Sequence, residues 1–178
     1  TKEELQEALN SACAGGYTDI VRHLVERKVD VNYKCNDRYG YPLLNAAAMK
    51  RLDVVEILLD AGADPNARSA DGQTPLSVAA SRHGSAATVQ LLLAKGAKLT
   101  ASERSPLINA AFAGDVESLK LLLPAAAGRK TTPLYAAVVA KCQPCIDLLL
   151  PVSNKDDCNR AIHLAARHGR AESPTGQH

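Results

Sequence analysis

The chain repeats a short motif four times, and this self-similarity constrains its fold more than any other feature. A Tyr, Thr or Ser followed by Pro-Leu occurs at residues 41–43, 74–76, 105–107 and 132–134. Each copy leads into an Ala-rich segment and then a Leu-rich one, the latter ending at Leu59, Leu93, Leu123 and Leu150. Self-similarity with a period of about thirty residues is typical of a solenoid. Stacked repeats form long surfaces and seldom form catalytic pockets.

Residues 71–100 show the unit most clearly. Asp71-Gly72 indicates a tight turn, and Thr74-Pro75 provides an N-cap followed by proline at the first helical position. A short helix with an apolar face follows, and a second helix turns Val89, Leu92 and Leu93 inward. Gly96 stands where a left-handed residue ends that helix. Each unit is therefore predicted to be a turn, a short helix, a longer helix and an extended return.

The composition fits closely packed helices. Apolar residues make up 46% of the 178 residues, aromatic residues only 3%, and Trp is absent. A formal net charge of +2 is too small to indicate nucleic-acid or membrane binding. No run approaches eighteen apolar residues, so we expect no membrane span.

The first residues and the cysteines bear on context. The chain begins without Met or an apolar signal region, so we interpret it as an excised piece whose flanking domains are not seen. Five irregularly spaced cysteines argue against a secreted disulfide framework. We therefore expect a cytoplasmic protein, with a nuclear location as an alternative.

Several stretches resemble ankyrin repeats. The sequence Asp-Gly-Gln-Thr-Pro-Leu at 71–76, with Leu-Leu-Leu-Ala-Lys-Gly-Ala at 91–97, is similar to the family pattern, and residues 9–32 and 38–66 fit the same register. Gly114-Asp115 with Leu119–Leu123 carries a further unit, and Ala161–Gly169 is similar to the family's first helix. The resemblance covers essentially the whole chain. It implies an all-α ankyrin-repeat solenoid of helix-turn-helix units, with β-hairpin fingers in the connections.

The predicted domain spans residues 1–178 as one array. Its units are expected at about 4–36, 37–69, 70–102, 103–130 and 131–157, with a partial unit at 158–178. The connections shorten along the chain: 18 residues separate Val25 from Leu43, but only 11 separate Leu123 from Leu134. We therefore expect two full-length fingers, a trimmed third, and little more than turns after that. The concave wall should be tallest over residues 33–104.

The cysteines near the C-terminal end allow a metal or redox interpretation. Cys142, Cys145, Cys158 and His163 have spacings that zinc sites use. In the repeat register, however, Cys145 faces the core, and His163 falls on the family's structural histidine, although Arg160 replaces the usual Thr. A redox-catalytic pair needs a strand-to-helix setting, which this segment between two helices lacks. Cys13 is expected in the core, and we predict no metal and no cofactor.

No other catalytic constellation is apparent. The chain has no Gly-rich phosphate loop, and its histidines have no nucleophile at a suggestive spacing. Asp156-Asp157 is interpreted as a solvated turn rather than an acid/base pair. The sequence does not support an enzyme.

The first finger is the strongest candidate for recognition. Three of the five tyrosines lie within residues 33–41, beside Arg38, and tyrosine and arginine dominate binding hot spots. Predicted partner-binding residues are Asp37, Arg38, Tyr39, Tyr41, Met49, Gln73, Arg82, His83, Arg104 and Phe112. The alternative is that Tyr41, Met49 and Phe112 only pack on neighbouring helices. The resemblance also implies possible asparaginyl hydroxylation at Asn32 and Asn66, where the family's asparagine normally has a structural role.

The expected function is a protein–protein interaction module that binds an extended peptide or protein surface in its concave groove, as a monomer. The alternative is an intramolecular scaffold that orients a catalytic, channel or ubiquitin-ligase domain outside this chain.

Overall fold

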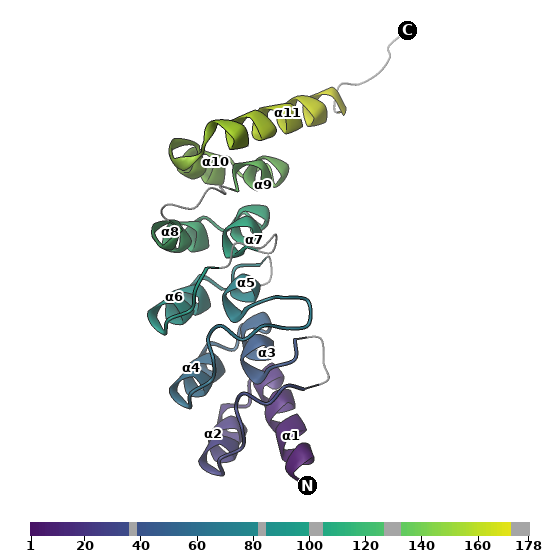
Figure 1. The fold of residues 1–178 in the computed structure, drawn as a ribbon, viewed down its shortest axis with the longest axis vertical. Coiled ribbons are helices and arrows are strands. Elements are labelled where there is room, and N and C mark those ends of the chain that lie inside the picture. The colour runs from purple at the N-terminus through teal and green to yellow at the C-terminus, as the bar shows by residue number, and fades with distance from the viewer. Residues whose placement is uncertain (36–38, 82–84, 100–104, 127–132, 172–178) are drawn as a thin grey trace.

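The computed structural model describes residues 1–35, 39–81, 85–99, 105–126 and 133–171, with side chains as far as residue 167. Its helices form two rows that run side by side along a gently curved stack (Figure 1). The inner row, on the concave side, consists of α1 (Lys2–Gly15), α3 (Pro42–Ala48), α5 (Pro75–Ala79), α7 (Pro106–Ala113) and α9 (Leu134–Val139). The outer row consists of α2 (Thr18–Glu26), α4 (Leu52–Asp60), α6 (Ala86–Ala94), α8 (Val116–Ala125) and α10 (Gln143–Leu149). A 3-10 turn (Leu150–Val152) and α11 (Lys155–Ala171) complete the stack.

The helix boundaries follow from local chemistry. At α5 the Thr74 hydroxyl accepts from the backbone N–H of Ser77 at 3.2 Å, and Ser77 Oγ accepts from the N–H of Thr74 at 2.9 Å. Pro75 fills the first helical position, where no N–H is required. Gly96 follows α6 with a φ of 87°, the left-handed conformation that glycine adopts without strain. The predicted start and stop signals of this unit are confirmed.

The core lies between the two rows. The motif leucines Leu43, Leu76, Leu107 and Leu134 are at most 3% exposed, and Leu58, Leu92, Leu122 and Leu149 of the outer row are 0% exposed. These residues belong to one continuous apolar cluster. Each unit buries its apolar surface between its own two helices and against the units beside it, so the array is stabilised by nearest-neighbour packing.

The connections shorten toward the C-terminus, as the spacing predicted. They run over residues 27–41, 61–74, 95–105 and 126–133. The described part of the chain contains no β-strand, so the hairpin fingers are not confirmed. Two connections instead close through turns: the Cys35 N–H donates to the Gly40 carbonyl at 2.8 Å, and the Ser69 N–H donates to the Gln73 carbonyl at 2.9 Å.

The C-terminal helix differs from its predicted form. The helix α11 begins at Lys155, so Asp156-Asp157 occupies its first turn and is not a solvated turn. Asp157 is only 7% exposed, and its N–H donates to Asn154 Oδ1 at 2.8 Å. Acidic residues are stabilised in a first helical turn by the helix dipole. This explains why α11 begins before Asp156-Asp157 and not after this pair.

Candidate functional site

A hollow of about 390 Å³ lies on the inner face, where α5, α7 and α9 end. Ser81, Asn109, Phe112, Ala113, Val139 and Ala140 line it, and we call it the inner hollow. Three successive units contribute to it, so no single repeat could form it alone. Phe112 and Val139 are 41% and 38% exposed, which places two large apolar side chains at the surface of the groove.

Phe112 is both exposed and supported. Its ring meets that of Tyr135 on α9 edge to face, with centroids 5.7 Å apart. This aromatic geometry is favourable and restricts the ring of Phe112. Phe112 is therefore exposed and also packs on the neighbouring helix α9, and its contact with a partner remains a prediction.

Polar groups at the hollow are held by inter-repeat hydrogen bonds. Asn109 Nδ2 donates to the carbonyl of Ser77 on α5 at 2.7 Å, which joins α7 to α5. Asn45 Nδ2 donates to Asn10 Oδ1 at 2.7 Å and joins α3 to α1 in a related way. These bonds fix the inner helices relative to one another, so the surface they form is preorganised.

Other predicted binding residues lie toward the N-terminal half. Met49, which follows α3, is 48% exposed. Tyr39 and Tyr41 are half-buried at the end of the first connection, and Gln73 is half-buried in the second. None of these four lines the inner hollow. Asp37, Arg38, Arg82, His83 and Arg104 lie outside the described residues, so their positions remain sequence predictions.

Sequence reasoning missed Val139 and Tyr135. Val139 stands six residues after its motif proline, as Phe112 does after Pro106. This shared register was the available signal. The longer connections favoured the first three units as the binding region. The hollow is instead formed mainly by residues of the fourth and fifth units, together with Ser81 of the third.

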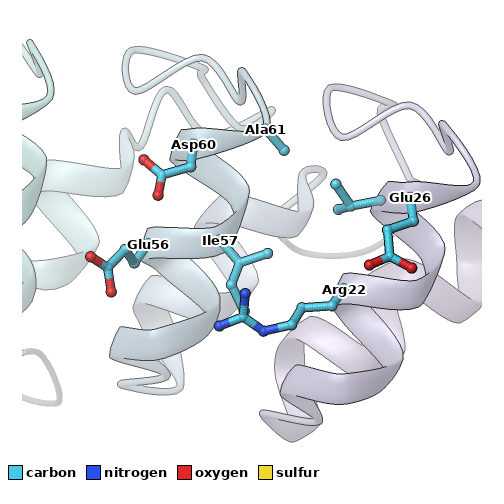
Figure 2. A pocket seen from close by; sticks show the side chains of 7 residues that line it. Arg22, Glu26, Glu56, Ile57, Asp60 and Ala61 are labelled. Carbon is cyan, nitrogen blue, oxygen red and sulfur yellow. The ribbon is translucent and has the colours of Figure 1, made fainter.

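A second hollow, of about 550 Å³, lies on the outer face between α2 and α4 (Figure 2). Arg22 extends from α2 toward Ile57 of α4, and Glu26 turns toward the same gap, whereas Asp60 forms an ion pair of 2.6 Å with Lys95 of the next unit. Val25, Ile57 and Ala61 supply apolar walls. It brings together no nucleophile and base, so we assign it no chemistry.

The predicted modification sites are anchored across repeat boundaries. Asn32 Nδ2 donates to the Gly62 carbonyl at 3.0 Å, and its Oδ1 accepts from the Asp64 N–H at 2.8 Å. One unit later, Asn66 makes the equivalent pair of bonds with Gly96 at 3.3 Å and Lys98 at 2.8 Å. Both asparagines thus have a structural role, and their hydroxylation remains a prediction.

The cysteines are arranged differently from a zinc site. Cys142 and Cys145 are joined by a disulfide, with Cα atoms 5.3 Å apart. This bond was not expected from the sequence, whereas the predicted core position of Cys145 is confirmed by its 0% exposure. Cys158 is half-buried on α11, and His163 on the same helix is exposed. Within the described residues, no three His, Cys, Asp or Glu side chains form a group that could hold a metal ion.

Two pKa shifts lie away from the inner hollow. Burial, and to a smaller degree neighbouring Cys35, raises the pKa of Cys13 to about 12, so that its thiol stays protonated in the core. The hydrogen bond from Lys95 to the Asp60 carboxylate raises the pKa of that exposed lysine. Neither group is placed for catalysis in the inner hollow.

The fold defines a helical-repeat protein whose inner helices are fixed to one another by hydrogen bonds. A family profile described as "Ankyrin repeats (3 copies)" matches residues 1–69, 62–129 and 107–173. The chain belongs to the ankyrin repeat family. Ankyrin repeats are generally protein–protein interaction modules and are typically non-catalytic.

Relatives with known names are much longer proteins. The chain is 29% identical over 180 residues to an ankyrin repeat and KH domain-containing protein of Caenorhabditis briggsae, covering 93% of this chain and 7% of that protein. It is 31% identical over 177 residues to the transient receptor potential cation channel subfamily A member 1 of Drosophila melanogaster, covering 97% of this chain and 14% of the channel. Human 2-5A-dependent ribonuclease is 44% identical over 62 residues, covering 35% of this chain and 8% of the ribonuclease. Within the described part of this chain, no helix is both long enough and apolar enough to cross a bilayer.

Proposed function

We propose that this chain is a protein-binding module whose inner hollow holds one apolar side chain of an extended peptide segment. The observation that supports this most directly is the exposure of Phe112 inside a hollow formed by three successive units. A large aromatic ring at the centre of a concave surface is the kind of residue that dominates binding energy.

The lining of the hollow suits such a side chain. Phe112 and Val139 provide apolar walls, and Ala113 and Ala140 leave space between them. The Asn109 amide nitrogen is engaged by Ser77, which leaves its carboxamide oxygen as an acceptor for a backbone N–H of the peptide. An isoleucine, leucine or phenylalanine in an extended segment would therefore gain both apolar contact and one main-chain hydrogen bond.

The rest of the segment would lie along the inner row toward the longer connections. Exposed Met49 and half-buried Tyr39, Tyr41 and Gln73 are the predicted binding residues in that half of the described chain. Because the inner helices are fixed to one another by hydrogen bonds such as that of Asn45 to Asn10, binding needs little ordering of the protein.

The test compares matched lysine substitutions. Peptides are selected from a random library displayed on phage, and their dissociation constants are measured for the wild type, Val139→Lys and Val152→Lys. Val139 lines the hollow, whereas Val152 is 53% exposed at the end of the 3-10 turn that follows α10, and it serves as the control. Val139→Lys should weaken binding on the order of tenfold or more, because it places an unpaired charge in an apolar contact.

Two results would contradict the proposal: equal affinities of the two lysine variants, or no peptide selected by the folded wild type. Thermal unfolding of each variant shows whether a loss of affinity reflects a loss of structure. The dissociation constant of the same peptide for the Phe112→Ala variant adds a second probe of the same site.

A scaffold function is supported by a different observation. The chain spans only 7% and 14% of the two relatives that it matches over most of its length. In such a context the inner face could orient a neighbouring domain of the same polypeptide. Joining a neighbouring domain of one of these relatives to the chain, and measuring whether that domain occludes the selected peptide, distinguishes the two functions.

A further inference from the structure

We propose that Cys142 and Cys145 form a reversible thiol–disulfide exchange site, and that a group attached to Cys142 opens the wall of the inner hollow. The pair lies at the start of α10, immediately after the turn that contributes Ala140 to the hollow. This chemistry requires no bound partner, so it does not depend on the proposed peptide-binding function.

The two sulfur atoms differ in access. Cys145 is 0% exposed and belongs to the apolar core, whereas Cys142 is half-buried at the surface. An attacking thiolate can therefore reach Cys142 but not Cys145. The Cys145 N–H also lies 3.3 Å from Cys142 Sγ and donates to it, which holds the Cys142 side chain at the start of the helix.

The bond is suited to exchange rather than to holding the fold together. Its cysteines are separated by only three positions in the sequence. A disulfide stabilises chiefly by closing a loop in the unfolded chain, and the effect is smallest for the shortest loops. Both cysteines belong to the same end of one unit, so breaking the bond releases no contact between distant units.

The exchange proceeds in two balanced steps. A thiolate of a small dithiol attacks Cys142 Sγ, the Cys142–Cys145 bond breaks, and Cys145 leaves as a thiolate that takes a proton from water. The second thiolate of the dithiol then attacks the dithiol sulfur that is bonded to Cys142. This bond breaks, and Cys142 leaves as a thiolate that is also protonated. The protein gains two electrons and two protons, and the dithiol becomes a cyclic disulfide.

A group attached to Cys142 would meet the preceding unit. Cys142 Sγ lies 3.8 Å from the Gly114 carbonyl oxygen, and a Cβ built on Gly114 would lie 3.8 Å from the Cys142 side chain. Cys142 Sγ is thus in van der Waals contact with the turn after α7, and a glutathionyl group on this atom would compete with that contact. We infer that a mixed disulfide at Cys142 moves the turn after α7 away from the turn after α9, and these turns carry Ala113 and Ala140 of the inner hollow.

The first experiment measures whether the bond is reduced in the folded chain. Wild-type protein equilibrated with oxidised glutathione is treated with dithiothreitol while circular dichroism shows a folded chain, and it is then unfolded, alkylated and mapped by peptide mass spectrometry. We expect residues 142 and 145 both to be recovered as alkylated thiols. Absence of the bond after oxidation, or reduction only in denaturant, would overturn the proposal.

A matched pair of variants tests the direction of attack. Cys145→Ser leaves Cys142, and Cys142→Ser leaves Cys145, with Cys158→Ser in both to remove another partly exposed thiol. With oxidised glutathione, Cys142 should form a mixed disulfide on the order of tenfold faster or more, because the thiol must be accessible to react. Equal rates would refute the assignment of Cys142. If a variant does not fold, brief alkylation of the fully reduced, folded wild type followed by peptide mapping compares the two thiols, because a thioether on Cys142 is not displaced by Cys145.

Hydrogen exchange then tests the coupling to the hollow. The Gly114 N–H donates to Ala111, and the Cys142 N–H donates to Ala137, both at 3.1 Å. Peptides that contain these amides should exchange severalfold faster in the glutathionylated Cys145→Ser protein than in the same protein without glutathione, while the exchange of peptides from α3 stays unchanged. Unchanged exchange at residues 114 and 142 would show that the modification leaves the hollow closed.

Discussion

Asn32 donates through its side-chain amide to the carbonyl oxygen of Gly62, thirty residues further along the chain, and so joins two successive units. The same carboxamide accepts from the Asp64 N–H. One side chain therefore satisfies two backbone groups that lie beyond the end of α4.

Replacing Asn32 by alanine should lower the free energy of unfolding by about 1–3 kcal/mol, because both backbone groups lose their partner. Asn66→Ala should have a smaller effect, since its bond to Gly96 is longer, at 3.3 Å. Urea denaturation gives both values, and exposed Asn159→Ala on α11 is the control. If the Asn32→Ala variant is as stable as the control, the Asn32 hydrogen bonds do not stabilise the boundary between the two units.

Lys28 offers a stabilising substitution. It follows α2 with a φ of 57°, at the place where Gly62 and Gly96 follow α4 and α6 with φ of 87°. A side chain in the left-handed region costs roughly 1–2 kcal/mol relative to glycine. Lys28→Gly should therefore raise the stability by about 1 kcal/mol.

The reverse substitution is the matched control for Lys28. Nothing lies within 4 Å of a Cβ built on Gly62, so Gly62→Lys changes the backbone preference without introducing a clash. It should destabilise the protein by a similar amount. If both substitutions shift the unfolding midpoint in the same direction, backbone strain is not the cause.

The buried thiol of Cys13 predicts a loss of stability in alkali. Its pKa is raised from 9.0 to about 12, so the folded state holds the proton more tightly than the unfolded state. The contribution of the Cys13 thiol to the stability is fully present below pH 9.0 and is lost as the pH rises toward 12. Urea denaturation at several pH values should show a steeper decline for the wild type than for Cys13→Ala. Parallel curves would mean that this thiol does not contribute.

The aromatic pair of Phe112 and Tyr135 should be measurable as a coupling between α7 and α9. A double-mutant cycle with Phe112→Leu and Tyr135→Leu should give about 0.5–1.5 kcal/mol beyond the loss of apolar burial. A cycle between Phe112 and exposed Tyr17 of the first unit is the control and should give no coupling. Coupling in the control cycle would point to a global change instead.

Much of the fold follows from local sequence signals. Thr74-Pro75 and Gly96 mark the ends of helices through hydrogen bonds and backbone conformations that involve only nearby residues. The shortening of the connections was readable from residue spacing alone. The start of α11 was not predicted because Asp-Asp favours both a turn and a first helical turn, and the helix dipole stabilises the second arrangement.

The candidate site was harder to predict. Phe112 was identified from its register, but the inner hollow also requires Val139. Val139 belongs to a unit with a short connection, and no binding residue was predicted there. The Cys142–Cys145 bond depends on the distance between two Cα atoms, which the local helix start sets. Such features arise where units meet, so they are specified by pairs of segments and not by either segment alone.

Within the described residues, the main contacts along the inner row join each helix to its neighbour in the series α1, α3, α5, α7 and α9. This arrangement has a mechanical consequence. Tension applied to the two ends of such a stack is carried in series, like a load on a row of linked springs. Each boundary can yield separately, so the weakest one opens first and the chain lengthens in steps of one unit. A protein built in this way can transmit small displacements between whatever is attached to its two ends.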